Sequence, residues 1–196
     1  MNNSYITIIK GKRTALSRKR VPLNQNECTA DFRIGVPFEQ NLHMCRLYEK
    51  FLLEYYRKEH PELSANASQI AWQLDDSANQ LLPKMQTDIM LSQENNILII
   101  DAKYYSHMTQ QQYGTNTLHS NNLYQIFTYV KNKEFELKDC EHTVSGMLLY
   151  AQTDEDVIPN NTYKMSGNQI SVRALNLNQD FSGIAKDLDS IVKFHF

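Results

Sequence analysis

Two β-rich runs on either side of a short polar segment constrain the fold of this chain more than any other feature. The first run covers residues 85–91 and the second covers 97–105, with Ser-Gln-Glu-Asn-Asn between them. This arrangement is typical of a β-hairpin. Residues 97–100 are all apolar, so both faces of the second strand would be buried, and we expect this strand to lie in the centre of a sheet. The chain is therefore predicted to fold around a buried hairpin.

Charged side chains interrupt this hairpin at a few positions. Alternation along the second strand places Asp101 and Lys103 on the same face. A tight turn centred on Glu94 and Asn95 would place Asp88 directly opposite Asp101, and a turn centred one residue later would place Asp88 opposite Lys103 instead. Either turn keeps the three charged side chains on one face, whereas a loop with an odd number of residues would separate them.

Two facing carboxylates in a buried sheet repel each other unless a cation lies between them. In the first register the Cβ atoms of Asp88 and Asp101 would be about 5 Å apart, which favours a divalent metal site. Mg²⁺ is the expected ion, since it accepts few protein carboxylates and keeps several waters, and Mn²⁺ is expected to substitute for it. The alternative is that Asp88 caps its strand while Asp101 and Lys103 form an ordinary surface ion pair. The buried surroundings favour the metal site.

A third acid lies within an amphipathic helix. The segment 38–59 follows Pro37 and stops before Pro61, and these prolines predict a helix over that range. Apolar residues at helical spacing form one arc of this helix, and most charged residues form the other. Glu49 lies on the apolar arc, where an ionised carboxylate is costly unless a cation or strong donors meet it. The alternative is an edge residue whose carboxylate reaches solvent.

The rest of the chain mixes strand and helix patterns. Residues 120–122 offer N-caps for a short helix over 123–131, in which Gln125 and Tyr129 stand four apart on one face. The other elements that we expect are a short strand or turn near 70–74, a strand over 143–151, a hairpin of 163–165 with 170–177, and an amphipathic helix over 181–192.

Positive charge is concentrated at the N-terminus. The first 26 residues contain no acid and six basic residues, namely Lys10, Lys12, Arg13, Arg18, Lys19 and Arg20. The rest of the chain therefore has 14 of the 20 basic residues and all 22 acidic residues. The net charge of −2 thus hides a basic arm on an acidic body. Such an arm could follow DNA phosphates, because each neutralised phosphate releases counterions. A solvated tail and a transit peptide are the alternatives.

Composition excludes several classes of protein. With 196 residues, 41% hydrophobic and 21% charged, the chain is an ordinary globular one with a single domain rather than a disordered or fibrous protein. No apolar run approaches the roughly 20 residues of a bilayer-spanning helix. The three cysteines include no C-x-x-C pair, which favours a reducing cytoplasm. There is no phosphate-binding G-x-x-x-x-G-K-[ST] loop, so we do not expect the chain itself to hydrolyse nucleotides.

The order of these features resembles that of a known nuclease superfamily. The chain resembles the PD-(D/E)xK nucleases of the RecB-like branch. These carry, in this order, an inward helix acid, a strand Asp, a D-x-K strand and a Q-x-x-x-Y helix. The matching residues are Glu49, Asp88, Asp101-Ala102-Lys103, and Gln125 with Tyr129. The segments LPKMQTDI (82–89), LIIDAKYY (98–105) and NLYQ (122–125) resemble, more narrowly, McrC, the nuclease subunit of modification-dependent restriction systems. The resemblance runs from about residue 38 to the end.

This resemblance implies a restriction-endonuclease-like α/β fold, with a mixed central sheet flanked by helices. The nuclease domain would cover 38–196 and the basic N-terminal arm 1–37. The implied function is Mg²⁺-dependent DNA cleavage, driven by a partner GTPase of the McrB type that recognises methylated cytosine. McrC-like proteins usually carry a longer N-terminal docking region, so either this region is reduced here or the chain is a nuclease-only relative. A stand-alone repair nuclease and a non-cutting DNA-binding or assembly subunit are the alternatives.

The resemblance also implies a role for each matched residue. Asp88 and Asp101 would hold the metal ion, with the Ala102 carbonyl as a further ligand. Lys103 would orient or activate the attacking water. Glu49 would be the helix acid, with Glu54 as the second choice. Gln125 and Tyr129 would shape the site or contact the DNA backbone.

Overall fold

The computed structural model of the chain describes five segments, which are residues 38–76, 80–104, 108–112, 115–152 and 158–196. The predicted basic arm lies outside them, together with its six candidate DNA-binding side chains, Lys10, Lys12, Arg13, Arg18, Lys19 and Arg20. Among the described residues, no helix has the length and apolar character needed to cross a membrane.

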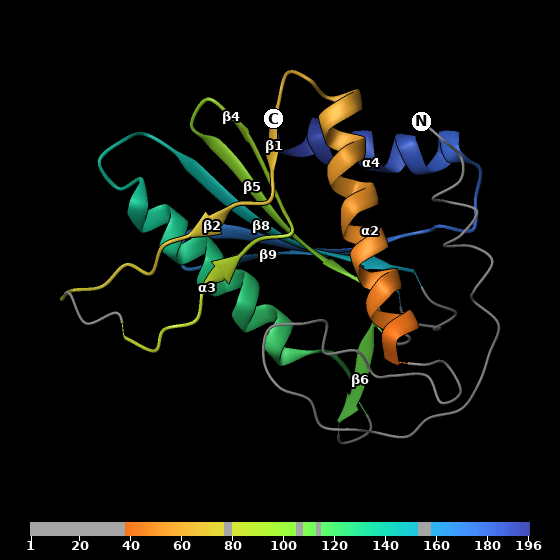
Figure 1. Ribbon diagram of the computed structural model, residues 1–196, viewed down its shortest axis with the longest axis horizontal. Helices are drawn as coiled ribbons and strands as arrows, with labels where there is room; N and C mark the ends of the chain where they lie inside the picture. Colours follow the sequence, from red (N-terminus) through yellow and green to blue (C-terminus); the bar gives the residue numbers. More distant parts are fainter. Residues whose placement is uncertain (1–37, 77–79, 105–107, 113–114, 153–157) are drawn as a thin grey trace.

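A six-stranded mixed sheet forms the centre of the fold (Figure 1). In spatial order its strands are β1 (Ser64–Asn66), β4 (Ile89–Gln93), β5 (Asn96–Lys103), β8 (Thr143–Ala151), β10 (Asn168–Leu175) and β9 (Asn161–Met165). The three central strands, β5, β8 and β10, are parallel, and the outer strands run antiparallel to their neighbours. Strand β5 is buried along almost its whole length, which confirms the prediction of a central strand.

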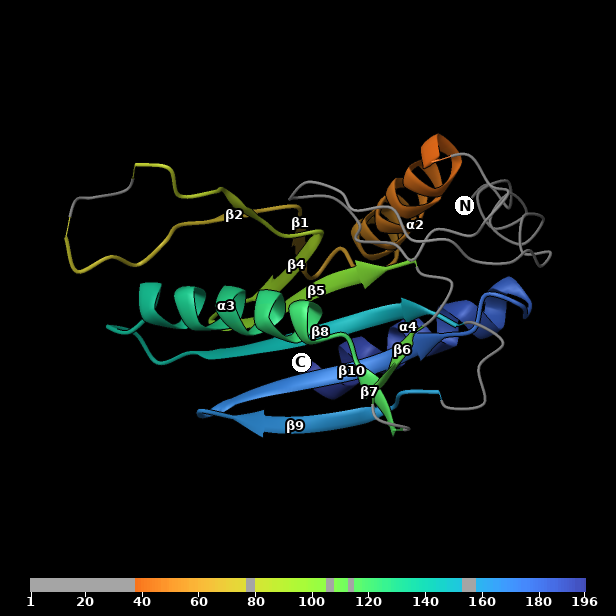
Figure 2. The same ribbon diagram turned by 90° about the horizontal axis from the view of Figure 1, so that it is seen from below.

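Helices cover both faces of this sheet (Figure 2). Helices α2 (Phe38–Glu59) and α4 (Phe181–His195) pack on one face, against the side of β5 that carries Leu98 and Ile100. Helix α3 (Ser120–Glu136) packs on the other face, against Ile97 and Ile99. Two small sheets also lie outside the main one, β2 (Gln69–Ile70) with β3 (Met85–Gln86) and β6 (Thr109–Gln112) with β7 (Thr115–Leu118). The predicted α/β class with a helix-flanked mixed sheet is confirmed.

The hairpin of β4 and β5 has the register of the first predicted turn. Gln93 pairs with Asn96, so the turn is centred on Glu94 and Asn95, with Glu94 at φ 52°. The predicted first strand is nevertheless wrong in one respect, because it divides into β3 and β4 at residues 87–88. Thr87 forms backbone and side-chain hydrogen bonds of 2.9–3.0 Å with Ser68. These bonds draw β3 away to pair with β2.

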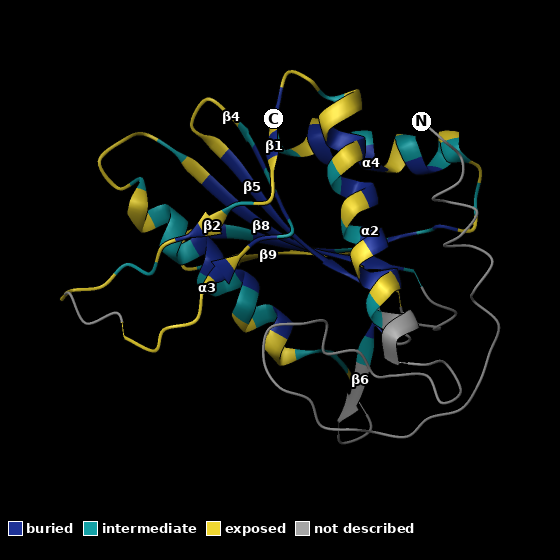
Figure 3. Ribbon diagram, in the orientation of Figure 1, coloured by how far each residue is buried: buried dark blue, intermediate teal, exposed yellow. Residues whose placement is uncertain are grey.

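Helix α2 has the bounds that its flanking prolines predicted. Its buried stripe faces the sheet and its exposed stripe faces outward (Figure 3). The buried side chains Tyr48, Leu52 and Tyr56 lie on the predicted apolar arc. Leu47 and Phe51 are also buried although the predicted arc did not include them. Hydrophobic periodicity therefore oriented this helix approximately.

Helix α3 is longer than predicted. It begins at Ser120, with His119 as N-cap and no capping side chain, so the N-cap prediction for 120–122 is wrong. It also continues past Lys131 to Glu136. Ion pairs of the i,i+3 type, Lys131 with Glu134 and Lys133 with Glu136, support these extra turns. Smaller differences are the β6–β7 pair, which was not predicted, and α4, which extends to His195.

Gly146 of β8 sets how closely α3 approaches the sheet. A Cβ atom at this position would lie 2.8 Å from side-chain atoms of Ile126 and Val130 on α3 and 2.9 Å from Ile170 on β10. Gly146→Ala is therefore expected to push α3 outward and to lower the free energy of unfolding by about 1–3 kcal/mol, as overpacking usually does. Urea denaturation measures this change.

Gly183→Ala is the matched control for Gly146→Ala. Its Cβ would meet only the flexible side chain of Gln179, and alanine favours a helix more than glycine does. The control variant is expected to be neutral or slightly more stable than the wild type. Equal losses of stability in the two variants would show that close packing at Gly146 is not what holds α3 in place.

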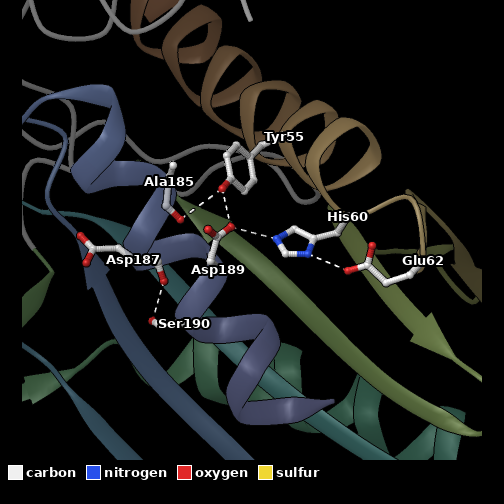
Figure 4. A network of polar contacts seen from close by, with 7 residues as sticks. All are labelled: Tyr55, His60, Glu62, Ala185, Asp187, Asp189 and Ser190. Carbon is white, nitrogen blue, oxygen red and sulfur yellow. Dashed lines mark hydrogen bonds and ion pairs between the residues drawn. The ribbon is translucent and has the colours of Figure 1, made fainter.

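A polar network joins the end of α2 to α4 on the face opposite α3 (Figure 4). The Tyr55 hydroxyl donates to Asp189 Oδ1 at 2.6 Å and contacts the Ala185 carbonyl oxygen at 3.1 Å. The His60 ring bonds Asp189 at 2.9 Å and Glu62 at 2.8 Å. Burial opposes the charged ring, but these two acids outweigh burial and raise the pKa of His60 above 6.5. The network thus favours an imidazolium between two carboxylates.

This raised pKa makes the junction sensitive to pH. Because folding raises the pKa of His60, its stabilising effect is complete below about pH 6.5 and is lost as the pH rises through the folded-state value. The melting temperature of His60→Asn should therefore fall further below that of the wild type at pH 5.5 than at pH 8.5. Differential scanning calorimetry at both pH values checks this. A gap that is independent of pH would contradict a charged His60.

Candidate active site

The two strand aspartates lie on neighbouring strands at one end of the hairpin. Asp88 directly precedes β4, and the β4–β5 register, continued by one residue, sets it opposite Asp101. Asp88 Oδ2 accepts a hydrogen bond of 2.8 Å from the backbone N–H of Ala102. Asp101 is only 2% exposed. The structure thus brings the two predicted acids together, and the Ala102 amide orients one of them.

Lys103 connects these acids to α3. Its Nζ lies 2.6 Å from Asp101 Oδ2 and donates a hydrogen bond of 3.1 Å to Gln125 Oε1. Gln125 Nε2 donates in turn to the Tyr129 hydroxyl at 3.0 Å, and this hydroxyl donates to the Gln86 carbonyl of β3 at 3.2 Å. The predicted helix pair therefore forms a continuous chain of contacts from the strand lysine to β3.

This chain of contacts engages the helix pair within the protein. Both ends of the Gln125 amide have partners, Gln125 is half-buried and Tyr129 is 8% exposed. Both roles predicted for the pair, the shaping of the site and contact with the DNA backbone, stay predictions.

Glu49 reaches the same group of charges from α2. Burial raises the pKa of Glu49, Lys103 opposes this rise and Asp101 adds to it. The second-choice helix acid, Glu54, is exposed and bonds Arg57 at 2.9 Å. The half-buried Glu49 is therefore the acid of α2 that shares the electrostatic environment of the aspartates.

Excess negative charge dominates this region. Burial, followed by the charges of Asp101 and Glu49, raises the pKa of Asp88 well above 3.8. Lys103 lowers the pKa of both Glu49 and Asp88, and Arg46 also lowers that of Glu49, but burial and the neighbouring carboxylates outweigh these cations. Neutralising this surplus requires either protons or a cation.

The residues fit a hard divalent cation. Asp101 Oδ2 is a buried carboxylate oxygen that lies 2.6 Å from the Lys103 ammonium. Oxygen ligands of this kind are those that Mg²⁺ prefers. Across the described segments, no three side chains of His, Cys, Asp or Glu converge on one point that could hold a metal. Direct coordination by Glu49, or by the Ala102 carbonyl, therefore stays a prediction, and the two aspartates are the core of the candidate centre.

Comparison with known proteins places the chain in a family. The family model described as "McrBC 5-methylcytosine restriction system component" matches residues 42–151, which is more than half of the chain. The chain belongs to this family. The candidate metal and catalytic residues, from Glu49 to Tyr129, fall inside the matched range. The basic arm, β10 and α4 fall outside it.

A curated relative supports the McrBC assignment. The chain is 35% identical over 155 residues to a protein named "Type IV methyl-directed restriction enzyme EcoKMcrBC" from Escherichia coli (strain K12). The aligned part is 77% of this chain and 43% of that protein. The chain therefore spans less than half the length of this McrBC relative.

One polar pair beside the site of this McrBC family member was not predicted. Asn122 was assigned to a helix cap, but its Nδ2 donates to the Tyr150 hydroxyl at 2.9 Å. The available signal was its spacing, since Asn122 precedes Gln125 by three residues and so shares its helix face. Nothing in the sequence identified Tyr150 as its partner, because that contact depends on how α3 docks on β8.

Proposed function

We propose that this chain is a Mg²⁺-dependent DNA endonuclease, and that it is the cleavage subunit of a GTP-driven, methylcytosine-dependent restriction system. The observation that carries the proposal is the contact of Lys103 with both Asp101 and Gln125, beside Asp88. An acid pair, a lysine and a residue that holds the lysine are the groups that metal-dependent phosphodiester hydrolysis needs. Membership of a restriction-system family supports DNA as the substrate.

The side chains would divide the work between binding and charge stabilisation. Asp88 and Asp101 would hold Mg²⁺, which when bound makes water a stronger nucleophile and polarises the phosphate. The Lys103 ammonium would donate to the attacking water or to a phosphate oxygen, where negative charge develops. Gln125 would hold that ammonium in one position, and Tyr129 would hold Gln125.

The partner assignment rests on the relative. The similar protein is named a methyl-directed restriction enzyme, and the implied motor is a McrB-type GTPase that recognises methylated cytosine. We infer that this chain acts with such a GTPase, because a nuclease site with no phosphate-binding loop needs another subunit to use GTP. The acidic body would then rely on that partner, or on the basic arm, to approach DNA.

The decisive experiment combines the purified chain with a GTPase of the McrB type, GTP, Mg²⁺ and a methylated plasmid. Cleavage that needs all four components is the expected result, and the same plasmid without methylation is the control. Cutting without the GTPase would favour a stand-alone repair nuclease. If the DNA stays intact in both Mg²⁺ and Mn²⁺, and calorimetry shows no Mg²⁺ binding, the chain is a non-cutting assembly subunit instead.

A further inference from the structure

A buried hydrogen bond ties the first turn of α3 to the central sheet. Asn122 is 2% exposed and Tyr150 is fully buried, and Asn122 Nδ2 donates to the Tyr150 hydroxyl at 2.9 Å. Asn122 lies on α3, and Tyr150 lies near the end of β8. Both residues also have other contacts.

This junction lies next to Lys103. Tyr150 is the register partner of Lys103 in the parallel β5–β8 pair, so the two side chains stand side by side on one face of the sheet. Asn122 lies one helical turn before Gln125, which accepts the hydrogen bond of Lys103. The Asn122–Tyr150 bond therefore links the strand beside Lys103 to the helix that holds its ammonium.

We propose that the Asn122–Tyr150 hydrogen bond positions Lys103 for catalysis. Neither residue need touch the substrate, and both act through Lys103 and Gln125. This inference rests on the proposed nuclease function, to which it adds two positioning residues that are not among the acids, the lysine and the Q-x-x-x-Y pair assigned to the site.

A polar contact restrains α3 in a different way from apolar packing. The contacts between α3 and β8 around Gly146 are apolar side-chain contacts. Apolar contacts are non-directional, so they oppose separation of the helix from the sheet more than small shifts along it. A hydrogen bond at 2.9 Å has a preferred length and angle, so it fixes one position of α3. The distance from Gln125 to Lys103 depends on that position.

Tyr150→Phe tests the proposal because it removes only the hydroxyl. We expect the single-turnover cleavage rate to fall roughly tenfold, with little change in DNA affinity or Mg²⁺ affinity, because small misplacements of reacting groups reduce rates strongly. Tyr55→Phe is the matched control, since it loses the same atom and its hydrogen bonds at the α2–α4 junction on the other face. The control should lower the melting temperature and keep the rate.

Asn122→Leu removes the same bond from the side of α3. It serves as the test if Tyr150→Phe does not fold. The loss of activity in the double variant should be smaller than the two single losses combined, because both changes remove the same bond. Additive losses, or a normal rate in both single variants, would overturn the proposal.

An NMR measurement separates this inference from the proposed function. With ¹⁵N-labelled lysine, the buried Lys103 ammonium should give a distinct signal, assigned through its loss in Lys103→Met. That signal should shift or broaden in Tyr150→Phe and stay unchanged in Tyr55→Phe. If the wild type never cuts DNA, the proposed function fails while this readout still tests the positioning of Lys103. An unshifted signal in Tyr150→Phe would overturn the inference even in an active nuclease.

Discussion

Asp88→Asn is expected to abolish DNA cleavage and, at the same time, to stabilise the metal-free protein. The loss of a metal-binding carboxylate removes several kcal/mol of transition-state stabilisation, which corresponds to a rate loss of roughly a thousandfold or more. Asparagine can still accept the hydrogen bond from the Ala102 N–H, so the local structure should persist. A cleavage assay in Mg²⁺ and thermal unfolding in EDTA measure the two effects.

The stabilisation should depend on pH. Because folding raises the pKa of Asp88 well above 3.8, the native state binds a proton more tightly than the unfolded state does. The free energy of unfolding of the wild type should then fall as the pH rises from about 3.8 through the folded-state pKa. The difference in free energy of unfolding between Asp88→Asn and the wild type should therefore grow over that pH range. A variant that retains near-normal cutting, or a stability difference that shrinks with rising pH, would contradict the assignment.

Asp101→Asn is the informative comparison for Asp88→Asn. It should abolish cleavage equally, because Asp101 is the other candidate ligand. It should gain little or no stability, since the substitution also removes the partner that lies 2.6 Å from Lys103 Nζ. Equal stabilisation by the two variants would mean that repulsion between the carboxylates outweighs the ion pair.

Lys103→Met is expected to keep metal binding and to lose the chemical step. The ammonium is not a metal ligand, and removing a positive charge beside the acids should leave Mg²⁺ affinity unchanged or higher. Loss of a donor to the developing negative charge should cost roughly 10²–10³ in rate. Calorimetric titration with Mg²⁺ and single-turnover cleavage measure the two quantities separately.

The matched control for this variant is Lys133→Met on α3. Lys133 forms an ion pair of 2.6 Å with Glu136 within its own helix, away from the aspartates in the sequence. This variant should cleave DNA normally. A parallel loss of Mg²⁺ affinity and cleavage in Lys103→Met would instead assign Lys103 to a structural ion pair.

The parts of the fold that the sequence predicted well depend on local rules. Prolines and helical periodicity gave the bounds and approximate orientation of α2. The sequence left two tight turns open, and the structure has the one at Glu94 and Asn95. Because side chains alternate along strands, either turn places Asp88 on the same face as Asp101. The acid pair of the candidate site was predictable for this reason.

The parts that the sequence did not predict depend on distant partners. Thr87 ends β3 because it bonds Ser68, nineteen residues earlier. Asn122 bonds Tyr150 rather than capping its own helix. The contact of Lys103 with Gln125 was not predicted either, because it forms only when α3 packs on β5 and β8. Local propensity contains no information on such contacts between separate elements.

The placement of the charged groups on one hairpin also affects how the site can change. Asp88, Asp101 and Lys103 lie within sixteen consecutive residues, so their mutual geometry is fixed by a single tight turn. Gln125 joins them through a separate connection, residues 104–119. A change in the length of this connection would therefore act on the position of Gln125, while the β4–β5 turn would still hold the two aspartates and the lysine in place.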